Sequence, residues 1–329
     1  MSLLPAFPLL TQLLFLLPIT AGLFGVLLPS LGYLPDLGGN QFNFDIFRQL
    51  FEHPALPHAV WLTLFSGISA TLISLFLAIL LAAMLSRESV SGNKNSRMSG
   101  LFVIVRRGLI PLIAVPHAAM ALGLAFLVAP SGWIVRWFSF LLMGWETPPE
   151  LVTVQDPFGL SLIFGLVLKE TPYLLLMILA ALPQIRAQEY IRIGQSLGYG
   201  NFRSWLKLVL PQVYPLIRLP VFAVLAFSLS VVDVALILGP TTPPTLSVLI
   251  LRWIDNPDLS FRFLASAGAV LLLLLTLGAL LCWRVSEWLL LQKWRNWLSN
   301  GKRGNGNEAQ KLAALSGLLL LGTAFLSVL

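Results

Sequence analysis

Apolar residues are concentrated in six long segments of the chain, and most of its charged residues lie between them. These segments are near or above the roughly 20 residues that a helix needs to cross the hydrocarbon core of a bilayer. Their apolar residues do not alternate with polar ones, which favours helices over the strands of a barrel. The sequence therefore predicts an all-α polytopic membrane protein with helices at residues 9–28, 59–85, 109–129, 160–182, 214–238 and 264–282.

A seventh apolar run follows a polar stretch and ends the chain without a polar or aromatic anchor. Membrane spans normally carry such anchors at the interface. Two interpretations stay open: a truncated seventh span at which the second half of a longer protein begins, or a complete C-terminal anchor. The expected organisation is a first helix with an outer segment (1–58), a membrane core (59–283) with a cytoplasmic loop (184–211), a basic linker (284–311) and the start of a further span (312–329).

The composition agrees with a lipid environment. Hydrophobic residues make up 57% of the chain and charged residues 11%, and the mean hydropathy is +0.86. A soluble globular protein carries about 25% charged residues. A water-soluble fold is therefore excluded.

The distribution of basic residues predicts the orientation in the membrane. Of the 21 Lys and Arg residues, 15 lie in the second, fourth and sixth stretches that follow the apolar segments. Cytoplasmic loops carry an excess of these residues. We therefore expect these loops and the N-terminus to be cytoplasmic. The net charge of +7 is then a signal of topology, and no nucleic-acid partner is expected.

Residue types that form catalytic and metal sites do not cluster in the sequence. Cys282 is the single cysteine, so it has no intramolecular disulfide partner, and no Cys/His group has zinc-ligand spacing. A Gly-x-x-x-x-Gly-Lys-Ser/Thr phosphate-binding loop is absent. We therefore expect a protein that is not an enzyme, binds no metal or cofactor itself and does not hydrolyse ATP.

The loop between the fourth and fifth apolar segments begins with the pattern of a short amphipathic helix. Tyr190, Ile193 and Leu197 recur at helical intervals. Gly198 can adopt the left-handed conformation that ends a helix. The sequence therefore predicts a corner at Gly198.

A second short helix is expected after this corner. Asn201 is a candidate N-cap, and Phe202, Trp205 and Val209 would share one face. Pro211 is expected to bend the chain into the fifth span. From the pattern alone, a helix that lies on lipid headgroups and a helix that docks on a partner are both open interpretations.

The spacing in this loop resembles a signature of the permease subunits of binding-protein-dependent ABC importers. That signature runs Glu-Ala-Ala, three variable residues, Gly, and Leu-Pro about a dozen residues later. Gly198 aligns with its glycine, and Leu210 and Pro211 align with its Leu-Pro. The opening triplet differs, because Arg192 stands at the position of the glutamate and Glu189 lies one helical turn earlier.

The resemblance implies the fold of a type I importer permease and a coupling function for this loop. The tripeptide Ser196-Leu197-Gly198 is similar to the sequence at this place in the thiamine and ferric-iron branch of the family. In the family, the loop sits in a groove of a separate ATPase subunit; here the apolar face around Leu197 and Trp205 would fill that groove. The residues to which the resemblance assigns this coupling are Glu189, Arg192, Leu197, Gly198, Trp205, Leu210 and Pro211.

Further partners follow from the same resemblance. ATP would bind to the ATPase subunit, and an extracytoplasmic solute-binding protein would dock on the outer face. A second permease half would complete the path, either as a second copy or as the other half of a fused two-half permease. The expected location is the bacterial inner membrane, and the function is import of a small solute.

Charged residues within the apolar segments are candidates for a translocation path. Lys169 and Glu170 lie in the fourth segment and Asp233 lies in the fifth. Charges at the bilayer centre usually face a cavity or pair with one another. Two interpretations stay open: Lys169 and Glu170 line the path, or they form a structural ion pair with another helix, for example with Asp233. A secondary transporter driven by an ion gradient, with these three charges as coupling groups, is the alternative function.

Overall fold

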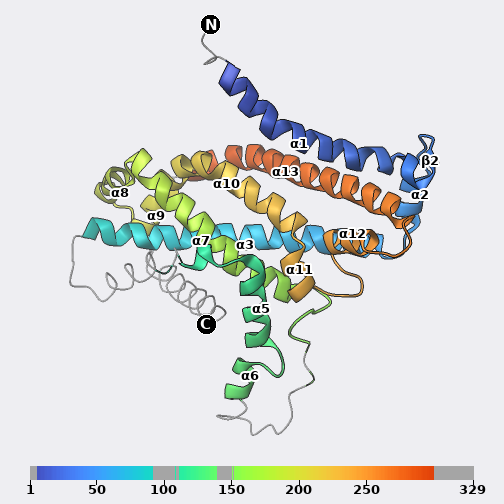
Figure 1. Ribbon diagram of the computed structural model, residues 1–329. Coiled ribbons are helices and arrows are strands. Elements are labelled where there is room, and N and C mark those ends of the chain that lie inside the picture. Colours follow the sequence, from blue (N-terminus) through green and yellow to red (C-terminus); the bar gives the residue numbers. More distant parts are fainter. Residues whose placement is uncertain (1–5, 92–107, 109–110, 139–149, 151, 300–329) are drawn as a thin grey trace. The chain divides into compact units, whose positions relative to one another are not determined.

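The computed structural model describes residues 6–91, 108, 111–138, 150 and 152–299 of the chain (Figure 1). In this part, six helices are long and apolar enough to cross a membrane. The prediction of an all-α multi-pass membrane protein is therefore confirmed. The run at 312–329, expected to start a further span, lies outside the described residues.

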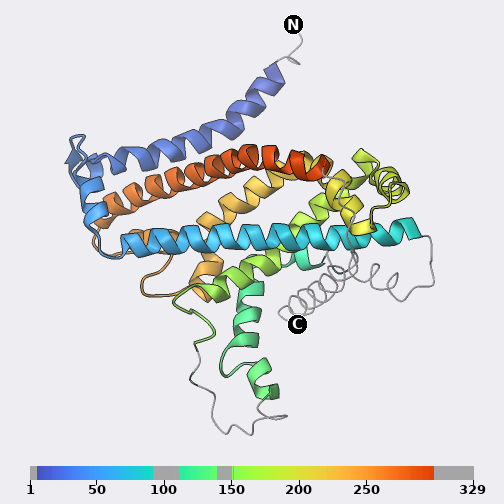
Figure 2. The ribbon, with the colours of Figure 1, turned by 180° about the vertical axis from the view of Figure 1, so that it is seen from behind.

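The chain forms two compact units, each built from two separate parts of the sequence. The first unit contains Met1–Thr63 and Pro243–Gly278, and the second contains Leu64–Thr242 and Ala279–Leu329. Helices α3 and α13 each contribute to both units. Figure 2 shows α3 as one continuous helix.

The first unit is built around a helical core with a short hairpin. The apolar side chains of Leu50, Leu246 and Ala267 are fully buried in this core. Thr63 Oγ1 accepts a hydrogen bond of 2.8 Å from the backbone N–H of Leu246, so it satisfies a free donor at the start of α12. The elements of this unit are α1 (Ala6–Ser30), β1 (Tyr33–Leu34), η1 (Pro35–Leu37), β2 (Gly39–Asn40), α2 (Asp45–Glu52), α12 (Leu246–Ile254) and the first parts of α3 (Leu56–Ser91) and α13 (Phe261–Ser299).

The second unit contains the loop and the charged residues selected from the sequence. One apolar cluster of its core has contributions from α3, α7, α8 and α10. Besides the remaining parts of α3 and α13, its elements are α5 (His117–Val128), α6 (Trp133–Phe138), α7 (Leu160–Ala181), η3 (Leu182–Ile185), α8 (Ala187–Ser196), α9 (Asn201–Ser204), the π-helix η4 (Trp205–Val209), α10 (Leu210–Ser230) and α11 (Asp233–Leu238).

Two of the predicted spans are interrupted in the structure. In the third span, a helical stretch at 111–114 stops before Pro116, and α5 begins at His117. Proline has no N–H and its ring clashes with the carbonyl one turn earlier, which ends a helix. In the fifth span, Val231 has an extended conformation between α10 and α11.

Glycine permits close helix packing in the second unit. A β-carbon on Gly165 of α7 would lie 2.4 Å from Leu238 Cδ1 of α11, and one on Gly67 of α3 would lie 2.6 Å from Leu229 Cδ2 of α10. Both distances are well below a normal contact, so a larger residue would force these buried leucine side chains to move.

Candidate functional site

One face of α8 packs on the body of the second unit. Ala187, Ile191 and Gly194 are buried on that face. A β-carbon on Gly194 would lie 2.4 Å from Ser204 Oγ and 3.1 Å from Leu208 Cδ1. The absence of a side chain at Gly194 therefore lets α8 approach α9 and η4 closely.

The other face of α8 carries exposed apolar side chains. Tyr190 is 37% exposed, and Ile193 and Leu197 are each 52% exposed. Glu189 and Arg192 are also exposed, and Glu189 lies 3.9 Å from the Arg186 guanidinium. We refer to Tyr190, Ile193 and Leu197 as the α8 face. The helix thus presents an apolar stripe beside accessible charges.

The turn after α8 has the geometry of a Schellman motif. Gly198 has φ +85°, in the left-handed region. The N–H of Gly198 donates to the carbonyl of Gln195 at 2.9 Å, and the N–H of Tyr199 donates to the carbonyl of Gly194 at 3.0 Å. This is the pair of bonds that closes a helix at a glycine. The predicted corner at Gly198 is confirmed.

The second short helix differs from the prediction at its start. It begins at Asn201, so the preceding cap position is held by Gly200, and no side-chain cap is present. The amide oxygen of Asn201 instead accepts a hydrogen bond from Gln195 Nε2 of α8. The expectation that Asn201 is the N-cap is wrong, because its side chain bonds to the neighbouring helix.

Trp205 does not belong to an exposed docking face. Its side chain is 0% exposed, and its Nε1 donates a 3.1 Å hydrogen bond to Ser86 Oγ of α3. Val209 is also fully buried, and Phe202 packs against the same core. The expectation that Trp205 fills a partner's groove is wrong. Helical spacing identified a shared apolar face but could not tell which surface covers it.

The end of the loop continues directly into the fifth span. Leu210 is 4% exposed and is the first residue of α10. Pro211 is the second residue of α10 and has no N–H to donate to the preceding π-helical turn. The π-helix η4 leads into α10 without a gap. The helix therefore does not break at Pro211, and the bend expected there stays a prediction.

Lys169 and Glu170 are buried and bond to the interrupted third span. Lys169 Nζ donates hydrogen bonds to the carbonyl oxygens of Leu112 at 2.9 Å and Ile113 at 3.0 Å, and also to that of Val115. Glu170 Oε1 lies 3.5 Å from His117 Nε2. The partners of these two residues thus lie in the third span, and Asp233 is not among them.

Asp233 lies apart from these contacts. It is exposed and is the first residue of α11. A carboxylate in the first turn of a helix is favoured by the helix dipole. In the described part of the chain, no ion pair joins Asp233 to Lys169. Whether these three residues line a path stays a prediction.

A polar cluster between α10 and α13 was missed by the sequence analysis. Glu287 is 8% exposed. Its Oε2 lies 3.0 Å from Arg218 Nε and 3.0 Å from Arg284 Nη1. Its Oε1 accepts a 2.5 Å hydrogen bond from the Tyr214 hydroxyl, which in turn accepts one of 3.1 Å from Trp283 Nε1. This cluster joins the helix that follows the loop to the end of α13.

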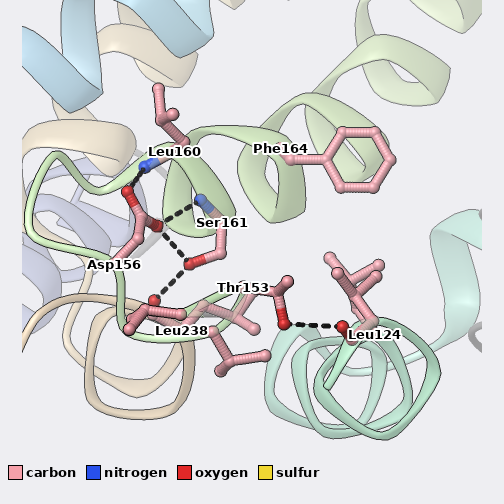
Figure 3. A pocket seen from close by; sticks show the side chains of 10 residues that line it. Leu124, Thr153, Asp156, Leu160, Ser161, Phe164 and Leu238 are labelled. Carbon is pink, nitrogen blue, oxygen red and sulfur yellow. Dashed lines mark hydrogen bonds between the residues drawn. The ribbon is translucent and has the colours of Figure 1, made fainter. Parts of the chain in front are cut away.

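A pocket of about 330 Å³ lies at the start of α7. Figure 3 shows the Asp156 carboxylate directed at the first turn of α7. It accepts hydrogen bonds from the N–H groups of Leu160 at 2.7 Å and Ser161 at 2.8 Å, and the Ser161 hydroxyl lies 2.8 Å from Oδ1. Ser161 Oγ is also 2.7 Å from the carbonyl of Leu238. The polar groups of the pocket thus bond within the chain, and its other lining side chains are mostly apolar.

A sequence comparison relates the chain to a bacterial membrane transporter. The inner membrane ABC transporter permease protein YnjC of Escherichia coli (strain K12) is 33% identical to the chain over 250 residues, which cover 76% of this chain and 44% of that protein. The chain thus spans less than half of the length of this relative. No protein-family model matches the chain.

Solved structures establish the fold. A chain from a bacterial ABC transporter involved in the import of the acidic polysaccharide alginate matches with a TM-score of 0.65 and 21% identity, covering 84% of this chain and 93% of that chain. A chain from a bacterial alginate ABC transporter in complex with an alginate pentasaccharide-bound periplasmic protein matches with a TM-score of 0.62 and 21% identity, covering 84% and 92%. The chain has the fold of these ABC importer chains.

Proposed function

We propose that the chain is a permease subunit, or one half of a longer permease, of an ABC importer in a bacterial inner membrane. It would form part of the translocation path, while a separate subunit binds and hydrolyses ATP. The sequence similarity to YnjC, which is named an inner membrane ABC transporter permease, supports this proposal. The shared fold with the alginate importer chains supports it as well.

The observation that carries the proposal is the α8 face. Tyr190, Ile193 and Leu197 are exposed on a helix whose opposite face is buried and whose end is fixed by the turn at Gly198. An apolar helical face that fits a partner's groove is a common mode of protein recognition. Glu189 and Arg192 would form the charged rim of this contact.

The packing around α8 gives a route for mechanical coupling. Gly194 lies against Ser204, and the next residue, Trp205, is bonded to Ser86 of α3. Packed interfaces of this kind move as units and do not deform continuously. A displacement of α8 by the ATPase would therefore reach α3 and α10 together.

The orientation and the partners belong to the same proposal. With the basic loops on the cytoplasmic side, α8 faces the cytoplasm, as does the N-terminus. The path would be completed by a second permease half, either a second copy or a homologous half. A solute-binding protein would dock on the outer side; one alginate importer was solved in complex with a periplasmic protein, which supports this arrangement.

We further propose a small charged nutrient as the solute. The support for this is the similarity of Ser196-Leu197-Gly198 to the thiamine and ferric-iron branch. The selectivity would reside largely in the solute-binding protein.

Site-specific photocrosslinking in growing cells tests the proposal. Benzoylphenylalanine replaces Leu197 on the α8 face, and in a matched control it replaces Phe126 of α5, which is 69% exposed. Position 197 is expected to capture a protein with a phosphate-binding loop, and position 126 is not. The proposal is wrong if position 197 never captures such a protein in importing cells. Uptake that follows a proton gradient in those cells would favour a secondary transporter.

A further inference from the structure

The break in the third span lies beside two consecutive charged residues of α7. Helical residues 111–114 end before Pro116, and α5 starts at His117. Lys169 contacts the segment before the break, and Glu170 contacts the first residue after it. Lys169 and Glu170 therefore contact opposite sides of the same break in the third span.

Lys169 matches the requirements of the first end. The last carbonyl groups of a helix have no intrahelical donor and carry a partial negative charge. The Lys169 ammonium has three N–H donors. They meet two carbonyls of the helical stretch, on Leu112 and Ile113, and the carbonyl of Val115 within the break. Lys169 is only 6% exposed, so little water is available to replace it at these carbonyls.

Glu170 lies at the second end and contacts it through a side chain. The first turn of a helix carries a partial positive charge that favours a nearby carboxylate. Glu170, with a side chain 7% exposed, lies 3.5 Å from the His117 imidazole at the start of α5. The Phe227 ring of α10 packs on the same imidazole, with ring centroids 4.6 Å apart.

The geometry of a helix explains how neighbours in sequence reach both ends. Consecutive residues point about 100° apart around the axis. Lys169 and Glu170 cannot share one partner, but they can reach two groups on either side of a short gap. The signs of the two charges also agree with the helix dipoles. The cation, Lys169, lies at the C-terminal end of the first half-helix, and the anion, Glu170, lies near the N-terminal end of the second.

We propose that Lys169 and Glu170 are positioning residues that hold the third span as two half-helices and set the direction of α5 relative to residues 111–114. Their role is to bind the backbone and the imidazole at the break. The placement of α5 then depends on these two charges, in addition to apolar packing.

Distances between spin labels across the break test this proposal. Cysteines replace Ala114 and Phe126, which are both exposed and lie on opposite sides of the break, in the full chain carrying Cys282→Ser. The matched control pair replaces Leu277 and Leu289, which have the same separation in the unbroken helix α13. Labelled protein in lipid nanodiscs is measured by pulsed electron spin resonance.

The expected result is a narrow distance distribution at both pairs in the parent protein. Lys169→Met and Glu170→Gln should each shift and broaden the distribution across the break and leave the α13 pair unchanged. Lys169→Arg should preserve the parent distribution, because a guanidinium still donates to several carbonyls. If Lys169 acted only by filling space, Lys169→Arg would not preserve the distribution better than Lys169→Met.

An unchanged distribution across the break in Glu170→Gln and in Lys169→Met would overturn the proposal. If Lys169→Met does not yield folded protein, the milder Glu170→Gln and the Lys169→Arg rescue decide the question. The measurement needs only this chain, so its outcome is independent of whether the proposed import function is right.

Discussion

Gly194 and Ser204 lie so close that any β-carbon on Gly194 would be 2.4 Å from the Ser204 hydroxyl oxygen. This approach sets the place of α8 on the second unit. A residue without a β-carbon at this position therefore lets α8 pack closely on Ser204.

Gly194→Val is expected to displace α8 and to destabilise the protein by about 1–3 kcal/mol, because overpacking forces neighbouring groups to move. Gly200→Ala is the matched control, since nothing lies within 4 Å of the β-carbon that it would add. The free energy of unfolding in detergent measures the effect. Equal stability of both variants would contradict the packing argument.

Gly198→Val should disturb the corner while leaving membrane insertion intact. Its φ of +85° is unfavourable by about 1–2 kcal/mol for residues other than glycine, and β-branched residues tolerate it least. Gly198→Asn is the milder comparison, because asparagine visits this region. We expect Val, more than Asn, to uncouple ATP hydrolysis from uptake and to lower the crosslinking yield at position 197.

Trp205→Ala is expected to cost about 3–5 kcal/mol of stability, because a large buried side chain leaves a cavity. Trp205→Phe should keep most of the packing and lose mainly the hydrogen bond to Ser86, a loss of about 1 kcal/mol. Leu197→Ala, on the exposed α8 face, should stay within about 0.5 kcal/mol of the parent. Denaturant unfolding in detergent distinguishes the three. A Trp205→Ala protein as stable as Leu197→Ala would contradict the buried position.

Glu287→Gln should destabilise the junction of α10 and α13, because Arg218 and Arg284 would lose a shared carboxylate. We expect a loss of about 1–3 kcal/mol, since hydrogen bonds to charged groups contribute about that much and both arginines are partly exposed. The control is Glu52→Gln, which breaks the exposed pair with Arg48 and should change stability by about 0–1 kcal/mol. Similar effects of the two changes would argue against the buried cluster.

The sequence predicted the membrane spans and the turn at Gly198 because both depend on local patterns. A run of apolar residues determines where a helix can cross a bilayer, and a glycine after a helical repeat marks its end. The break before Pro116 had a local signal as well, but proline is also tolerated within membrane helices. The sequence alone could not separate these two outcomes.

Contacts between distant segments could not be predicted in the same way. Trp205 is bonded to Ser86, 119 positions earlier in the chain, and Tyr214 is bonded to Glu287, 73 positions later. Periodicity defines a face of a helix but not the element that covers it. For this reason Trp205 was assigned to a partner's groove, and the Glu287 cluster was not found.

The carbonyl of Leu238 has a further consequence for how the membrane helices can rearrange. It accepts a 3.1 Å hydrogen bond from the N–H of Gln155 and lies 2.7 Å from Ser161 Oγ. Sliding of α11 along α7 would break both contacts, whereas rotation of α10 about the non-helical Val231 would break neither. Val231 therefore divides the fifth span into two parts: α11, whose last carbonyl lies against Gln155 and Ser161, and α10, which is continuous with the loop and buried in the apolar core.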